Sequence, residues 1–133
     1  MPVKNANIAI GATFAPTGGT ATAFIPSATP VQGGIQIVAT ADTNPATRRN
    51  ITCKSRAATI DPKTGKFSGK DKRSAIIVFP EVLPDSSIVY NLGRVELEPH
   101  PQSAIPISTL KSGVLNLVAD ADFDNFWAYG SVE

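Results

Sequence analysis

Two alternating segments joined by a turn-rich connection occupy the middle of the sequence and constrain its fold more than any other feature. The first covers residues 48–57 and the second covers residues 70–79, and the connection contains Asp61, Pro62, Gly65 and Gly69. Because successive side chains of a strand point to opposite faces, each segment has one face of cations and hydroxyls and one mostly apolar face. We therefore predict two strands of a sheet whose apolar side is covered by helices and whose other side meets an anionic partner.

The candidate binding face follows from this two-residue period. It combines four cations from three predicted strands with two hydroxyl side chains of the same parity: Lys54, Arg56, Lys72, Arg94, Thr52 and Ser74. Cations can meet phosphates there, and hydroxyls can bond to bases or to the ribose 2′-OH. Tyr90 has the same parity and offers a surface on which an unpaired base can stack. The alternative is a solvated sheet face whose charges are balanced by Glu96 and Glu98.

The net charge of +1 conceals a segregation of charge along the chain. Residues 48–73 carry nine basic and two acidic side chains, a net +7, whereas residues 74–133 carry two basic and eight acidic ones, a net −6. Residues 1–47 are neutral, with one Lys and one Asp. This distribution indicates a local cationic surface and a polyanionic partner. A solvated basic hairpin, which discourages strand addition at a sheet edge, is the competing explanation.

Further strands are predicted on both sides of this pair. Residues 6–15 and 20–25 alternate around a Pro-Thr-Gly-Gly turn and predict an N-terminal hairpin. Residues 35–40 and 88–98 predict two more strands of the sheet. Nothing in this part of the chain alternates between strands and helices, so we expect antiparallel pairing.

The period changes to a helical one after Pro106. Leu110, Val114 and Leu117 recur at helical spacing, and Asp120 or Asp122 is expected to cap a second short helix that ends before a glycine. Strands followed by two helices are typical of an α+β fold. We predict one domain over residues 1–133, with the hairpin in 1–26, the main sheet in 35–98 and the helices in 106–130.

Patterns for catalysis and metal binding are weak. His100 lies between two prolines, and Cys53 shares its strand face with Ile51, which favours a small buried thiol over a nucleophile. The aspartates at 120, 122 and 124 imitate the start of a calcium loop, but Asn125 and Ser131 stand where that loop needs Gly and Glu. We therefore expect no enzymatic activity, no catalytic residues, no cofactor and no metal.

The cellular setting is constrained by simple absences in the sequence. No apolar run approaches the ~20 residues of a membrane span, and the N-terminus has no apolar segment typical of a secretion signal. A single cysteine allows no internal disulfide and favours a reducing compartment. We expect no membrane partner and no small-molecule substrate.

Four motifs together resemble the coat proteins of single-stranded RNA bacteriophages. They are Arg-Arg-Asn-Ile-Thr-Cys-Lys-Ser-Arg at 48–56, the basic strand ending in Phe79-Pro80, Arg-Val-Glu-Leu-Glu-Pro-His-Pro at 94–101, and Ala-Asp-Phe-Asp-Asn-Phe-Trp-Ala-Tyr-Gly-Ser at 121–131. Length and element order match the family over essentially the whole chain. The first forty residues match only in their hairpin character.

The resemblance implies an N-terminal hairpin, a five-stranded antiparallel sheet and two C-terminal helices. It further implies that two subunits join their sheets edge to edge into one continuous sheet and cross their helices. Such dimers assemble into an icosahedral shell whose inner sheet face binds a hairpin of the viral RNA, and in studied members this binding also represses replicase translation. The implied location is the virion capsid, assembled in the bacterial host cytoplasm, and the family has no enzymatic activity.

Site residues carried over from the family lie on three strands. Those that match its RNA-facing positions are Thr52, Lys54 and Arg56 on the first, Lys72 and Ser74 on the second, and Arg94 and Glu96 on the last. The chain departs from better-known members at Ile76, where a base-binding pocket would have a polar or basic side chain, and in a longer loop at 58–69. Both departures favour binding that is largely electrostatic. The loop at 80–87 corresponds to the one that meets symmetry mates at the vertices of the shell.

Two proteins of other classes are also compatible with the sequence. One is a single-stranded nucleic-acid-binding β-module, such as a small barrel, which needs no surfaces for closed assembly. The other is a phage tail or decoration subunit that binds no nucleic acid. Charge reversal on the cationic face distinguishes the RNA-binding hypotheses from the last one.

Overall fold

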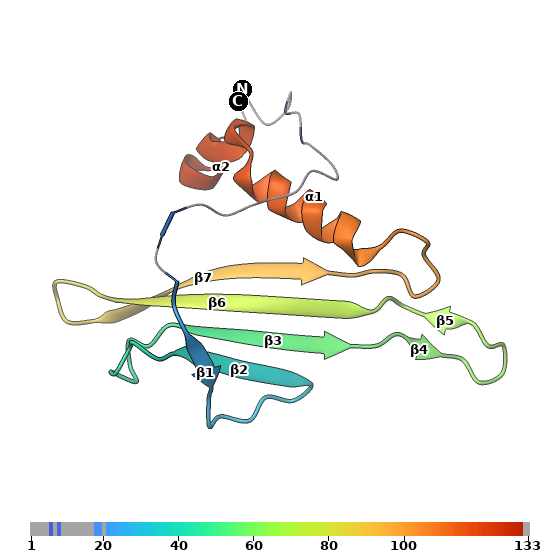
Figure 1. The fold of residues 1–133 in the computed structure, drawn as a ribbon, viewed down its shortest axis with the longest axis horizontal. Helices are drawn as coiled ribbons and strands as arrows, with labels where there is room; N and C mark the ends of the chain where they lie inside the picture. Colours follow the sequence, from blue (N-terminus) through green and yellow to red (C-terminus); the bar gives the residue numbers. More distant parts are fainter. Residues whose placement is uncertain (1–5, 7, 9–17, 20, 132–133) are drawn as a thin grey trace. The chain divides into compact units, whose positions relative to one another are not determined.

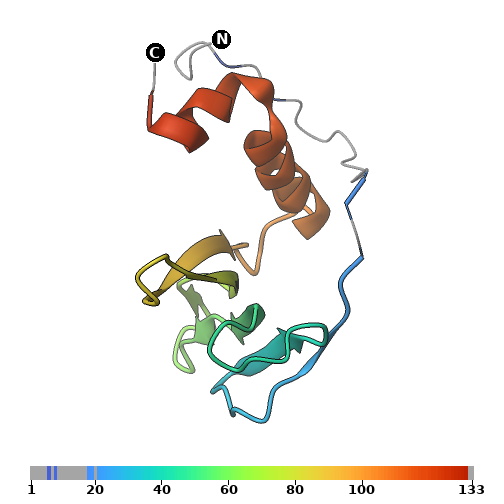
Figure 2. The ribbon, with the colours of Figure 1, turned by 90° about the vertical axis from the view of Figure 1, so that its left-hand side faces the viewer.

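Five antiparallel strands form the sheet that carries the candidate site. The structure, a computed structural model, describes residues 6, 8, 18, 19 and 21–131. Chain neighbours are also neighbours in the sheet (Figure 1), in the order β1 (Phe24–Pro26), β2 (Gly34–Ala39), β3 (Asn50–Arg56), β6 (Lys72–Val82) and β7 (Ile88–Leu97). Seen along its strands, the sheet is a single layer (Figure 2). The predicted five-stranded antiparallel sheet is confirmed.

Only one of the two strands predicted for the N-terminal hairpin lies in the described part of the chain. The segment predicted as its second strand, 20–25, overlaps β1, which pairs with β2 at the outer edge of the sheet. The segment predicted as its first strand, 6–15, lies outside the described residues except for residues 6 and 8.

Both predicted loops between the long strands are more regular than the sequence indicated. The connection 57–71 contains a two-stranded ribbon of β4 (Thr59–Ile60) and β5 (Phe67–Ser68), which extends beyond the ends of β3 and β6 (Figure 1). At the other end, β6 continues through Pro80 to Val82, so that the predicted loop at 80–87 shrinks to residues 83–87. Pro80 is tolerated because β3 ends opposite Val78, and the missing N–H of Pro80 therefore faces no strand.

The C-terminal segment, described over residues 102–131, belongs to a second unit of the chain. Its described elements are α1 (Ile107–Ala119), a 3₁₀ turn η2 (Ala121–Phe123) and α2 (Asp124–Tyr129). Asp120 caps the turn, because its carboxylate accepts the N–H of Asp122 at 2.8 Å. Gly130 ends α2 in the left-handed region with φ +71°. Helix capping therefore accounts for Asp120, and the two predicted helices are confirmed.

Very little of the chain is buried. Among the described residues, Ala39 is the one buried hydrophobic residue. Large apolar side chains that are mostly open to solvent include Leu92 (65% exposed), Tyr90 (58%) and Trp127 (53%). None of the described helices is long and apolar enough to cross a membrane. A chain with 42% hydrophobic residues thus leaves much of its apolar surface exposed when it stands alone.

Candidate nucleic-acid interface

The register of β3, β6 and β7 places all seven predicted site residues on one face of the sheet, here called the cationic face. Residues directly opposite one another across an antiparallel pair are within side-chain contact range. Three such rows run across the strands: Arg56–Lys72, then Lys54–Ser74–Glu96, then Thr52–Ile76–Arg94. The two-residue period therefore predicted the parity of all three strands correctly.

A shallow hollow of about 470 Å³ lies over these rows. Six of the seven predicted residues line it: Lys54, Arg56, Lys72, Ser74, Arg94 and Glu96. Thr52 lies on the same face but does not line the hollow. Gln32 and Gly33 also line it from the β1–β2 connection, where Gly33 accepts the N–H of Ser55 at 3.0 Å. Sequence reasoning missed these two residues, because nothing local indicates that a turn reaches the site.

The charges on the cationic face are unevenly compensated. Lys72 Nζ lies 3.1 Å from Glu96 Oε1, and both side chains remain more than a third exposed. Such exposed ion pairs contribute about 0–1 kcal/mol and leave their members available to a stronger partner. Within the part of the chain that the structure describes, Lys54, Arg56 and Arg94 make no ion pair. Three cations are therefore available to phosphates, and the fourth, Lys72, forms an ion pair with Glu96.

Along the strands, the cationic face changes into an apolar one. Beyond the row that contains Ile76, the same parity carries Val78 opposite Leu92 and Pro80 opposite Tyr90. Both Leu92 and Tyr90 are more than half exposed. The face thus offers a charged half for phosphates beside an apolar half on which the predicted stacking residue Tyr90 is accessible to a base.

The opposite face of the same strands, here called the apolar face, is chemically different. A hollow of about 420 Å³ there is lined by residues that include Ile35, Cys53, Ala75, Val95 and Leu97. Cys53 is half-buried in the single chain, so the prediction of a buried thiol is not met by this chain alone. Among the described residues, no group of three His, Cys, Asp or Glu side chains is placed to hold a metal ion.

Not every cation of the basic segment serves the candidate interface. The guanidinium of Arg49 donates to both carboxylate oxygens of Asp42, at 2.8 Å to Oδ2 and 3.2 Å to Oδ1, and the Arg49 N–H adds a third bond at 3.0 Å. These hydrogen bonds hold the pKa of Asp42 below its ordinary value. Arg48 donates to the carbonyl of Ala39 at 3.3 Å. Both arginines therefore stabilise the β2–β3 connection by bonding its end to its beginning. Their sequence position did not reveal this role.

Known proteins similar to this chain were found among solved structures. No protein-family model and no curated protein matches the sequence. The virus-like particle of bacteriophage GQ-907 matches with 34% sequence identity and a TM-score of 0.88, over 98% of this chain and 99% of that one. The virus-like particle of bacteriophage AVE019 matches with 11% identity and a TM-score of 0.64, over 88% of this chain and 92% of that one, which shows a shared fold.

Proposed function

Because the chain belongs to the coat proteins of single-stranded RNA bacteriophages, we propose that it dimerises, closes an icosahedral shell and packages single-stranded RNA against its cationic face. Its role in the capsid is structural, as its likeness to virus-like particles over nearly the whole chain indicates. Its place in the virion is the capsid. Assembly in the host cytoplasm is part of the proposal.

Dimerisation is supported by the unpaired edge of β7 and by the exposed apolar surface of the single chain. Among the strands that the structure describes, β7 is an edge strand, and its ten residues have a strand partner on one side only. Exposed edges of this length are normally paired or covered, and an isologous pairing of two β7 edges would create one continuous sheet. The apolar face and the helices would gain the burial that one chain lacks, which suits an obligate interface of more than about 2,000 Å².

RNA packaging rests on one observation, the in-register arrangement of cations over three adjacent strands. Lys54, Arg56 and Arg94 have no ionic partner among the described residues and border one hollow together with hydroxyl-bearing Ser74. A flat, open cationic surface suits single-stranded or looped RNA, whose bases can be splayed out, better than a stiff duplex. Among the described strands the sheet is open, with edges at β1 and β7, which argues against the rival hypothesis of a small barrel.

We also propose that the chain recognises an RNA hairpin and that this binding represses translation. Ile76 occupies the centre of the face, between Thr52 and Arg94. An aliphatic side chain there offers no hydrogen bond to a base, so we expect phosphate contacts to dominate affinity and to make it strongly dependent on salt.

Electron microscopy of the protein expressed alone in bacteria, before and after nuclease treatment, tests the assembly. Uniform closed particles that contain nuclease-protected RNA are the expected result. Small soluble oligomers at permissive salt and concentration would contradict the proposed coat function.

The double variant K54E/R56E tests the binding face. We expect it to remain folded and dimeric but to lose RNA, with affinity reduced by about 100-fold or more at low salt, because two phosphate contacts become repulsive. Lys111→Glu, an exposed charge reversal on α1, is the matched control and should package RNA normally. Unchanged RNA content in K54E/R56E would refute the assignment of the site.

A further inference from the structure

We propose that the β4–β5 ribbon, residues 57–71, is a second contact for single-stranded RNA, in which Lys63, Lys66 and Lys70 bind backbone phosphates without regard to sequence. None of the three belongs to the candidate site on the sheet. The inference rests on the proposed packaging of RNA and adds to it a separate surface.

The ribbon is held in a defined shape by its own hydrogen bonds. Asp61 N–H donates to the carbonyl of Lys66 at 2.8 Å, and Gly65 N–H donates to the carbonyl of Asp61 at 2.8 Å. The Asp61 carboxylate accepts the N–H of Lys63 at 2.9 Å. Gly65 closes the turn at φ +68°, a conformation that glycine adopts without strain. The lysines are therefore displayed by a short hairpin and not by an irregular loop.

The two carboxylates of the ribbon are occupied by backbone groups. Asp61 accepts within the turn, and Asp71 Oδ1 accepts the N–H of Ala58 at 2.8 Å at the base of the ribbon. Asp71 N–H also donates to the carbonyl of Pro99 at 3.1 Å, which anchors the base to the segment after β7. Neither carboxylate forms an ion pair with the lysines, so the ribbon keeps its positive charge.

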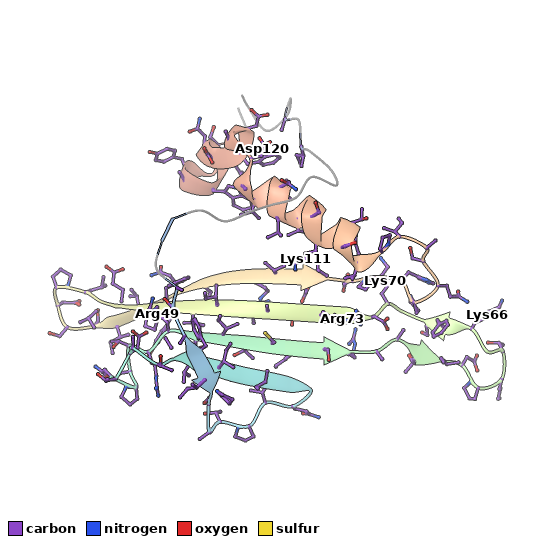
Figure 3. All side chains as sticks on the ribbon, in the orientation of Figure 1. Arg49, Lys66, Lys70, Arg73, Lys111 and Asp120 are labelled. Atoms are coloured by element: carbon purple, nitrogen blue, oxygen red, sulfur yellow. The ribbon has the colours of Figure 1, made fainter. Side chains whose placement is uncertain are left out.

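All three lysines are exposed, and none makes an ion pair in the part of the chain that the structure describes. Figure 3 shows Lys66 on the ribbon, beyond the end of the sheet, and Arg49 toward the opposite end. The ribbon begins directly after the Arg56–Lys72 row, which is the last pair of the β3–β6 ladder. At about 3.3 Å per residue, its tip lies on the order of 15–20 Å past that row. The cationic track of the sheet therefore continues along the ribbon for the length of several nucleotides.

The chemistry of the ribbon favours RNA over a protein partner. Protein interfaces are depleted of lysine and need an apolar centre. On the ribbon, Ile60 and Phe67 are the large apolar residues; they lie directly opposite each other, Phe67 is half-buried and Ile60 is 56% exposed, so the apolar surface is small. Lysine is a flexible point charge that can follow irregularly placed phosphates.

The triple variant K63Q/K66Q/K70Q tests the proposal through the salt dependence of binding to poly(U) RNA. Removal of three phosphate contacts should make the slope of log affinity against log salt shallower by about 2, and should weaken binding at low salt by about tenfold or more. Lys66→Gln alone should lower the slope by about 0.7, and Lys111→Gln, which removes one exposed charge from α1, should leave it unchanged. The variant K63R/K66R/K70R should restore the slope of the unsubstituted protein.

Comparison with K54E/R56E separates the two proposals. If K54E/R56E loses RNA and the triple Gln variant keeps the full salt slope, the ribbon proposal is overturned while the packaging function stands. If the triple variant binds poly(U) normally but forms no shells, the ribbon is a contact between subunits and the proposal is again overturned. If neither variant changes RNA binding, the packaging function itself has failed, and the ribbon proposal fails with it.

Discussion

The two faces of the sheet are built from the same strands, yet they are suited to different partners. On β6, Ser74 points to the cationic face and the adjacent Ala75 points to the apolar face. The hollows on the two faces are similar in size, about 470 and 420 Å³. What differs is the lining. The hollow on the cationic face has mostly lysine, arginine and glutamate, whereas the hollow on the apolar face has mostly aliphatic side chains and a thiol, with Arg73 also among its lining residues.

In the function proposed above, one layer of strands would contact two partners. Since adjacent residues face opposite ways, each strand contributes to both surfaces, and neither surface needs a core of its own within the chain. In the proposed shell, the apolar face would be stabilised by burial in the assembly, while the cationic face would stay open to RNA. Substitutions of neighbouring residues should therefore have different consequences, with loss of stability and assembly on the apolar face and loss of RNA on the cationic face.

The largest effect is expected where β2 and β3 approach most closely. A Cβ added to Gly34 would lie 1.8 Å from the carbonyl oxygen of Cys53, which is backbone and cannot move aside. Gly34→Ala should therefore lower the free energy of unfolding by about 3 kcal/mol or more, measured by urea denaturation at fixed protein concentration. Gly93→Ala is the control, because its Cβ would meet the Cγ2 methyl of Ile77 at 3.1 Å, a side-chain contact that a shift of a few tenths of an ångström relieves, and it should cost about 1 kcal/mol. Equal losses in the two variants would contradict this account of the strand spacing.

The contrast between the faces is tested directly by placing one charge on each. Ala75→Asp puts a carboxylate on the apolar face and should cost about 3 kcal/mol of stability and most particle assembly, provided that this face is buried in the shell. Ser74→Asp should cost less than about 1 kcal/mol and should instead reduce the RNA content of the particles. Urea unfolding and nuclease-protected RNA are to be measured on both variants. If both lose stability to the same degree, the two faces are not distinct in the assembly.

A smaller effect is expected from the carboxylate on the cationic face. Glu96→Gln removes the partner of Lys72 and one negative charge from the hollow. Affinity for poly(U) should rise by about threefold and its salt dependence should steepen, as one more cation becomes available to phosphate. Stability should change by less than about 1 kcal/mol, because the pair is exposed. Weaker RNA binding in this variant would instead indicate that Glu96 contacts the RNA itself.

The smallest effect is expected at the Asp42–Arg49 ion pair, which links the two ends of the β2–β3 connection and lines neither hollow. Hydrogen bonds from Arg49 lower the pKa of Asp42 in the folded protein from its ordinary value of 3.8. A lowered folded pKa gives stabilisation that is fully present above 3.8 and is lost as the pH falls through the folded pKa. Asp42→Asn should therefore be slightly less stable than the unsubstituted protein at neutral pH, and the difference should vanish on acidification below 3.8. A difference that persists in acid would assign the loss to something other than the charge of Asp42.

Much of the fold and of the candidate site was predictable from the sequence, and the errors have a common cause. The parities of Lys54, Lys72 and Arg94 were predictable, since alternation is a property of each strand by itself. The capping role of Asp120 was predictable in the same way. The β4–β5 ribbon, the extension of β6 through Pro80, and the approach of Gly33 to the hollow were not. Each of these depends on which segments lie opposite one another.

Three features could be read directly from the amino-acid sequence: the alternation of side chains, the change from a strand period to a helical one, and the segregation of positive charge into 48–73. All three follow from local covalent geometry and composition, so no partner segment is needed to read them. The register of the strands became known only from the three-dimensional structure, which places Lys54 opposite Ser74 and Ser74 opposite Glu96. The same holds for the ion pairs of Lys72 with Glu96 and of Arg49 with Asp42. A slip of one of these strands by one residue would have moved its cations from the cationic face to the apolar face, and the energy that excludes such a slip comes from contacts between segments distant in the chain.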